Sequence, residues 1–152
     1  MPVGIMTTKR AEYISNDDGT KVLVAFYEGH FGPTLRVDIQ KRETLQAVRD
    51  RVDMLMTGRM QTCELADSDL FVLAPPIRSV VLAVVPKVRF RKRMTMQKDR
   101  ESNLSLNWIQ KEEDWEDIRD FIDNLLSTDR PTHLEFLDSD LNDAIVELAY
   151  RQ

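Results

Sequence analysis

Apolar residues recur at helical spacing in two segments of the chain. In the first segment they are Leu45, Val48, Val52 and Leu55. In the second they are Trp115, Ile118, Ile122 and Leu125. Residues three and four positions apart lie on one face of a helix, so both segments are predicted to be amphipathic helices packed on a core. Thr44 is expected to cap the first helix, and Gly58 to end it in a left-handed conformation.

Shorter runs predict strands. Leu35, Val37 and Ile39 alternate with polar residues, the period of a half-buried strand. The turn 16–19 ends in Asp-Gly and predicts a hairpin between residues 11–15 and 21–27, with a loop at 29–33. Further strands are expected at 62–65, 70–73, 77–85, 88–96, 104–109, 133–137 and 144–150. Because the connections are short, we predict an α+β fold in which antiparallel sheet packs against the two helices.

The two helical segments belong to longer stretches that resemble each other. With an offset of 70, Arg49, Asp50, Asp53, Leu55 and Thr62 match Arg119, Asp120, Asp123, Leu125 and Thr132. With an offset of 71, Glu64, Asp67, Ser68, Asp69 and Leu70 match Glu135, Asp138, Ser139, Asp140 and Leu141. This period predicts two related strand-helix-hairpin units, about 11–76 and 77–152, in a single domain covering 1–152. The alternative is chance, from a common helical period and two Asp-Ser-Asp turns.

Composition narrows the class of protein. The chain has 152 residues, of which 42% are hydrophobic and 31% charged, as expected for one globular domain with a core. Cys63 is the single cysteine, which excludes an intrachain disulfide and a zinc site built on cysteines. The N-terminal sequence lacks the apolar core of a signal peptide, and the run 80–85 is too short to span a membrane. We therefore expect a cytoplasmic protein.

The net charge of −5 is unevenly distributed. From residue 110 onward there are 13 acidic and 4 basic residues, a balance of −9, so the preceding part carries +4. The acid gathers on the second helix, where Asp114 belongs to the first turn and complements the helix dipole. A basic protein partner is expected to contact Glu112, Glu113, Glu116, Asp117, Asp120 and Asp123. The alternative is a merely solvated helix face.

A basic run precedes this helix. Lys87, Arg89, Arg91 and Arg93 alternate with mostly apolar residues up to Met96, so a strand there would carry four cations on one face. Such a face could bind phosphates, as in a nucleic-acid-associated or regulatory protein. The face lacks aromatic residues for base stacking, which argues against RNA. The alternatives are internal pairing with the acidic helix and a charged edge strand that resists aggregation.

Motifs for catalysis are missing. The sequence has no Gly-x-Ser-x-Gly, phosphate-binding glycine loop or His-Glu-x-x-His. The turn 138–143 resembles the start of a calcium loop, but Asp143 replaces the required glycine and Ala149 the final glutamate. Cys63 and His133 occupy corresponding positions of the two units, which separates them rather than forming a dyad. We predict a non-enzymatic protein without metal or cofactor.

The second half resembles the immunity proteins that bacteria encode beside polymorphic toxins. The resemblance rests on an acidic helix beginning near Trp115, a strand containing His133 and a last strand, 144–150. It covers about 40 residues and is one of layout. It implies a non-enzymatic inhibitor that binds a cognate toxin, often by presenting acidic side chains to a basic active-site cleft.

Overall fold

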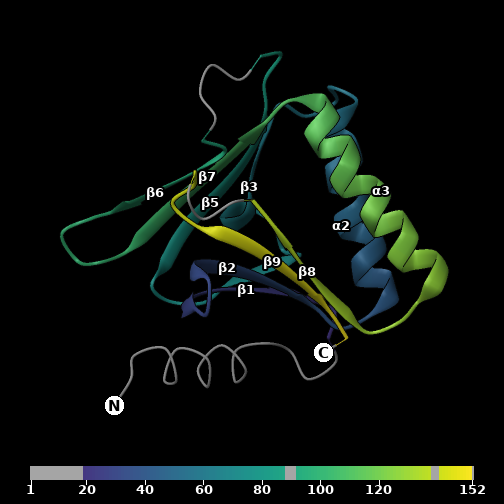
Figure 1. Cartoon of the computed structure of the whole chain (residues 1–152), viewed down its shortest axis with the longest axis horizontal. Helices are drawn as coiled ribbons and strands as arrows, with labels where there is room; N and C mark the ends of the chain where they lie inside the picture. The colour runs from purple at the N-terminus through teal and green to yellow at the C-terminus, as the bar shows by residue number, and fades with distance from the viewer. Residues whose placement is uncertain (1–18, 88–91, 138–140, 152) are drawn as a thin grey trace.

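The computed structural model describes residues 19–87, 92–137 and 141–151. Figure 1 shows the strands gathered into two sheets, with two long helices side by side. The elements are β1 (Val22–Gly29), β2 (Gly32–Ile39), α2 (Arg42–Met56), β3 (Thr62–Glu64), the short 3₁₀ helix η1 (Leu65–Asp67), β4 (Phe71–Leu73), β5 (Ile77–Val84), β6 (Met94–Lys98), β7 (Leu104–Gln110), α3 (Glu112–Thr128), β8 (Thr132–Phe136) and β9 (Ile145–Tyr150).

The fold is α+β, as predicted, and both sheets are mixed. Sheet A has the order β4-β1-β2-β9-β8, and sheet B the order β3-β5-β7-β6. The pairs β1–β4, β2–β9 and β5–β7 are parallel, and the other pairs are antiparallel. Antiparallel pairing was expected because the connections between consecutive strands are short. The parallel pairs instead join strands that are not consecutive, so the length of local connections carried no information about them.

The two sheets are built by the same pairing scheme. The hairpin β1–β2 precedes α2 and lies beside β9 and β8, which follow α3. The hairpin β6–β7 precedes α3 and lies beside β5 and β3, which follow α2. The registers agree as well. Ile39 pairs with Tyr150 and Ile109 pairs with Ala83, and 109 minus 39 is 70. Tyr150 then pairs with Thr132 and Ala83 with Thr62, again 70 apart.

This scheme places β5 in the first series, β1-β2-α2-β3-β5, and leaves β6-β7-α3-β8-β9 as the second. The sequence interpretation began the second unit at residue 77, the first residue of β5. It also expected residues 62–65 and 70–73 to form a hairpin, which is wrong because β3 lies in sheet B and β4 in sheet A. The helix η1 and the turn after it carry the chain from one sheet to the other. There the Ser68 hydroxyl accepts a hydrogen bond from the Leu70 N–H at 3.2 Å.

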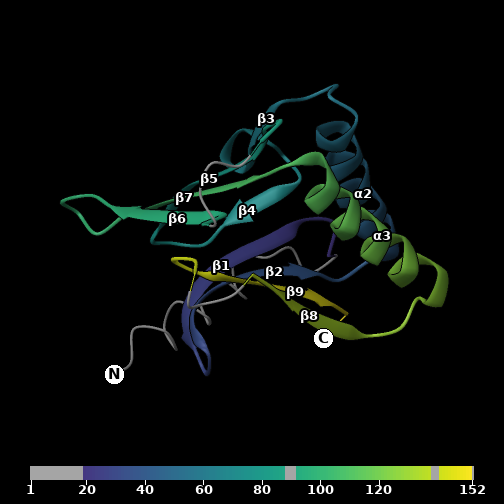
Figure 2. The same cartoon turned by 45° about the horizontal axis from the view of Figure 1, so that its top comes forward.

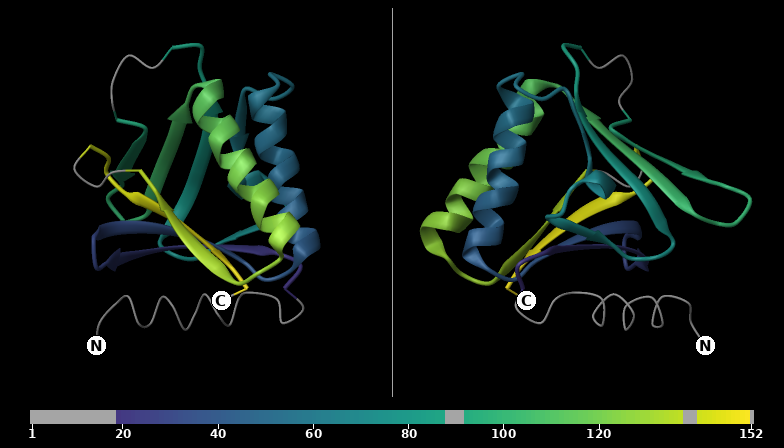
Figure 3. Two further views of the ribbon diagram at one scale, coloured as in Figure 1. Left: turned by 45° about the vertical axis from the view of Figure 1, so that its right-hand side comes forward. Right: turned by 180° about the vertical axis from the view of Figure 1, so that it is seen from behind.

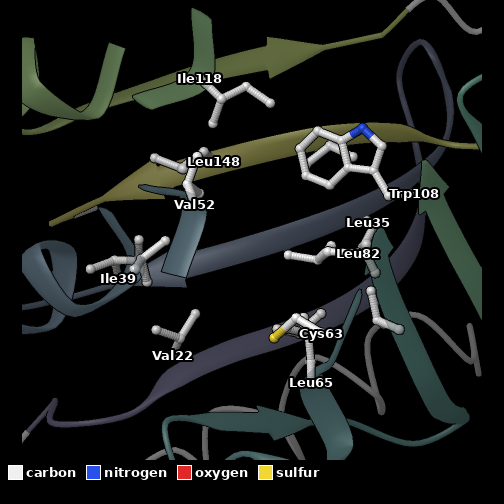
Figure 4. Packing of buried hydrophobic residues seen from close by; sticks show 14 of the residues in the cluster. Val22, Leu35, Ile39, Val52, Cys63, Leu65, Leu82, Trp108, Ile118 and Leu148 are labelled. Atoms are coloured by element: carbon white, nitrogen blue, oxygen red, sulfur yellow. The ribbon is translucent and has the colours of Figure 1, made fainter. Parts of the chain in front are cut away.

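Both helices lie side by side at one end of the two sheets (Figures 2 and 3). All eight positions predicted to face the core are buried: Leu45, Val48, Val52, Leu55, Trp115, Ile118, Ile122 and Leu125. They belong to one cluster that also takes in side chains from both sheets. Figure 4 shows Val52 of α2 and Ile118 of α3 with Leu148 of sheet A and Leu82 and Trp108 of sheet B. One core therefore serves both series.

Local predictions had mixed outcomes. Gly58 follows α2 with a φ of 78°, and Gly19 has a φ of 68°, as the turn chemistry requires. Thr44 does not cap α2, because the helix begins at Arg42 and the Thr44 hydroxyl donates to the Gly19 carbonyl at 3.1 Å. Residues 29–33 form a tight hairpin joining β1 directly to β2 rather than an open loop. The expected strand 11–15 lies outside the described residues.

Candidate functional site

Helix α3 is held to the core by its apolar face. The Trp115 side chain is fully buried, and its indole N–H donates to the carbonyl oxygen of Ala83 in β5 at 2.9 Å. Its ring lies 4.9 Å from that of Trp108 in β7, measured between centroids. Phe121 packs edge-on against Phe136 of β8 at 5.6 Å. These contacts to both sheets fix the direction in which the acidic residues of the helix project.

Two carboxylates of α3 are used inside the molecule. Asp114 in the first turn bonds the Arg93 guanidinium at 3.2 Å. Asp123 bonds the guanidinium of Arg49 in α2 at 3.0 Å, and this hydrogen bond raises the pKa of Arg49. Asp123 was predicted to contact a partner. The structure directs it toward α2, with a side-chain exposure of 43%.

The Arg49–Asp123 pair has a counterpart across the helix interface. Arg119 of α3 bonds Asp53 of α2 at 3.1 Å. Arg49 and Arg119 are 70 residues apart, and so are Asp53 and Asp123. Each helix thus gives its arginine to the other helix's aspartate, the reciprocal arrangement of an interface with two-fold symmetry. Four of the matched charged residues, Arg49, Asp53, Arg119 and Asp123, therefore join α2 to α3.

The remaining carboxylates of α3 project outward, and we call them the acidic ridge: Glu112, Glu113, Glu116, Asp117 and Asp120. Glu113 lies 3.8 Å from Lys111 with its side chain 83% exposed, and Asp120 lies 3.5 Å from Arg119 with 60% exposed. In the described part of the chain, the other three side chains have no ion pair. Like charges at this spacing cost a few tenths of a kcal/mol per pair. The helix dipole offsets that cost in the first turn alone.

The basic segment was predicted to be a strand over residues 88–96, and within the described residues the strand begins at Met94. β6 begins at Met94, so Lys87, Lys92 and Arg93 lie outside any strand, whereas Arg89 and Arg91 fall outside the described residues. Lys92 bonds Asp143 at 2.8 Å, and Arg93 bonds Asp114 of the acidic helix. For Arg93, the structure adopts the alternative of internal pairing with that helix. Lys87 is exposed after β5.

The turn that resembled a calcium loop covers the edge of sheet B. The Asn142 side-chain oxygen accepts the backbone N–H groups of Arg93 and Met94 at 2.6 and 2.9 Å. The Asp143 carboxylate accepts the N–H of Met96 at 2.9 Å, and its bond to Lys92 lowers its pKa. Among the described residues no group of three or more His, Cys, Asp or Glu side chains could hold a metal ion. Residues 138–140 lie outside this description.

Cys63 does not meet His133. The cysteine lies in β3 of sheet B and the histidine in β8 of sheet A. Burial raises the pKa of the Cys63 thiol, although the charge of Arg51 acts in the opposite direction. The raised pKa keeps the sulfur in its less nucleophilic thiol form. An open depression of about 430 Å³ lies beside it, rimmed by Glu64, Asp67 and Asp69. The Glu64 carboxylate is itself occupied, accepting the Val80 N–H at 3.0 Å.

One charged site, on the outer face of sheet A, was not predicted from the sequence. Glu147 in β9 has a side-chain exposure of 10% and bonds Arg36 of β2 at 3.1 Å. It also accepts the hydroxyl of Tyr27 in β1 at 3.1 Å. Burial and the Glu147 charge raise the pKa of Tyr27. The available signal was a glutamate within the apolar run 144–150, which must be paired wherever both faces of a strand are buried.

Comparison with protein-family models, curated proteins and solved structures finds no match. No helix in the described parts of the chain is both long and apolar enough to cross a membrane.

Proposed function

We propose that this chain is a non-enzymatic, cytoplasmic protein-binding module whose acidic ridge contacts a basic surface of a protein partner. The specific form that we propose is an immunity protein that neutralises a cognate bacterial toxin by occluding it. The observation that supports it best is the division of carboxylates on α3. Asp114 and Asp123 are turned toward arginines, whereas the ridge carboxylates face solvent.

The ridge is suited to this role because the helix that carries it is rigid. Trp115 and Ile122 are fully buried below it, and α2 supports it from the side. A partner that binds here therefore loses little free energy to ordering the backbone. Unlike charges across an interface act mainly by accelerating association, and that acceleration falls with added salt. Fast, salt-sensitive binding of a basic protein is the expected signature.

The direct test reverses the middle of the ridge with the substitutions Glu116→Lys, Asp117→Lys and Asp120→Lys. The product of the neighbouring gene is the first probe. We expect the association rate constant to fall by about tenfold or more and its salt dependence to weaken. Growth rescue by co-expression then tests whether that partner is a toxin.

A matched control applies the same change of charge elsewhere. Glu28, Glu43 and Asp50 are exposed on β1 and α2, and all three are replaced by lysine. If the protein acts through α3, this control leaves association nearly unchanged. A partner that binds equally well to both triple variants would show that the acidic ridge is not the contact surface.

The alternative proposal is a nucleic-acid-associated or regulatory protein that uses the basic segment. Of its four cations, Arg93 is paired with Asp114, Lys87 is exposed, and Arg89 and Arg91 lie outside the described residues. Titration with single-stranded and duplex DNA at about 50 mM salt checks this, since backbone contacts are strong under such conditions. We expect no binding.

A further inference from the structure

Among the described strands, four form the edges of the two sheets, and they are covered to different degrees. β3 and β4 have three residues each, and β6 is covered by Asn142 and Asp143. β8 has five residues, and among the described strands only β9 pairs with it. Figure 2 shows β8 at the margin of sheet A, next to β9. Natural sheets normally shorten, charge or cover an edge of this kind, because it can accept another strand.

Two side chains of β8 lack contacts that a further strand would supply. Leu134 shares the inner face with its register partner Leu148, yet it is 38% exposed. On the outer face, Glu135 lies directly opposite Glu147, which is already bonded to Arg36 and Tyr27. Like charges in opposite positions destabilise a sheet. Glu135 forms no ion pair within the described residues, so its free side lacks a cation or a hydrogen-bond donor.

We propose that β8 pairs with β8 of a second copy of this chain, in an antiparallel register centred on Leu134. The side chain of Leu134 then meets Leu134 of the second copy. His133 lies opposite Glu135 of the second copy, and the same pair forms again on the other side of the two-fold axis. An imidazole can donate a hydrogen bond to a carboxylate, so each Glu135 gains the donor that its own sheet does not supply.

Neighbouring registers are less favourable. A register centred on Glu135 brings two carboxylates face to face, and one centred on His133 places Pro131 opposite Glu135. The register centred on Leu134 instead extends both faces of sheet A. Leu148 and Leu134 continue into the same residues of the second copy on the inner face. The row Arg36, Glu147 and Glu135 continues into His133 of the second copy on the outer face. The two five-stranded sheets become one.

This self-association uses β8 and not the acidic ridge, so it stands independently of the proposed function. Its test is sedimentation equilibrium of the full chain over a wide concentration range. We expect a reversible monomer–dimer equilibrium that Leu134→Lys weakens by about tenfold or more, because two ammonium groups would meet at the axis. Gln97→Lys places the same charge on the exposed face of β6 and leaves the equilibrium unchanged.

A charge exchange tests the register itself. His133→Glu places a glutamate opposite Glu135 of the second copy on both sides of the two-fold axis. We expect this variant to weaken the dimer by about tenfold. Adding Glu135→His to that variant restores the unlike pairs and the dimer. Both side chains are exposed, so these variants stay informative even if Leu134→Lys fails to fold.

Amide hydrogen exchange within 132–136 should also slow as protein concentration rises. A chain that stays monomeric at the highest concentration overturns the proposal, and so does a dimer insensitive to the substitutions in β8.

Discussion

The two series of this molecule share their strand pairing and differ in what they present to solvent. Helix α2 carries three arginines against three acidic residues, whereas α3 carries one arginine against seven. The edge of β1 is covered by a whole strand, β4, whereas the equivalent edge of β6 is covered by two side chains. The edge strand β3 has three residues, whereas the equivalent edge strand β8 has five.

The differences thus lie where side chains leave the shared framework. Positions 70 apart that face the core or the helix interface keep their character, as Leu55 and Leu125 do. Some solvent-facing positions differ, such as Gln46 and Glu116, although the exposed Asp50 and Asp120 match. The excess of acidic residues lies on α3. A framework with a two-fold pairing scheme therefore carries a one-sided surface, and the second series is where function is expected.

The largest effect on stability is expected when matched core leucines are replaced. Leu55→Ala and Leu125→Ala remove the same side chain from equivalent buried positions, and each should cost about 2–5 kcal/mol of unfolding free energy. Urea denaturation of both variants measures the costs. Asp50→Ala and Asp120→Ala serve as controls, because both side chains are 60% exposed and should cost little. Costs that differ widely between the two leucines would break the equivalence.

The covering of the two sheet edges should respond unequally to mutation. Asn142→Ala removes the acceptor of two backbone N–H groups and should cost about 1–3 kcal/mol, with faster exchange of the Met94 amide. Ser68→Ala lies in the equivalent loop of the first series and should cost less. There the edge is held by backbone bonds such as Val22 N–H to the Leu70 carbonyl at 2.8 Å. Equal costs would show that β4 contributes little.

The position of Tyr150 is occupied in the first series by Ala83, which has no hydroxyl group. Burial and a hydrogen bond to Asp129 raise the pKa of Tyr150 to about 12. The folded state therefore favours the neutral phenol. Its contribution is complete below pH 10 and is lost as the pH rises toward 12. Tyr150→Phe should cost about 1 kcal/mol at neutral pH. Denaturation at several pH values should show wild type and variant converging above pH 10. A constant gap would contradict the assignment.

The smallest effect concerns the reciprocal ion pairs. Double-mutant cycles on Arg49–Asp123 and Arg119–Asp53 should each give a coupling of about 0.2–1 kcal/mol, since the side chains are partly exposed. The second pair should couple more strongly, because its side-chain exposures are 20% and 26% against 27% and 43%. Raising the salt concentration should reduce both couplings. Coupling in one pair alone would break the reciprocity.

Sequence patterns predicted the parts of the fold that depend on local periodicity. The spacing of Leu45, Val48 and Val52 was sufficient to identify both a helix and its buried face. The matched residues Arg49 and Asp53 were also recognised, but the sequence did not indicate that each bonds across the helix interface. A repeat shows which residues correspond and leaves open whether they lie in contact.

Strand partners could not be predicted, because alternation fixes the faces of a strand and not its neighbours. Nothing in residues 145–150 indicates that β9 lies between β2 and β8. The assignment of Arg93 to a strand was wrong for a related reason. The alternation of the basic segment suggested a strand through Arg93, but hydrogen bonds to Asn142 and Asp114 decide the conformation there, and both residues are distant in sequence. Likewise, the inward turn of Asp123 follows from the position of α2, which the sequence pattern does not supply.

The place of β9 in sheet A has a consequence for how the chain folds during synthesis. Ile39 pairs with Tyr150, which lies 111 residues later, because 150 minus 39 is 111. The hairpin β1–β2 therefore leaves the ribosome long before its permanent neighbour exists, with the β2 edge open. Pairings of such long range slow folding, because the chain must lose much entropy before the contacts form. Until β9 emerges, that open edge is the point at which the nascent chain is most exposed to aggregation and to chaperones.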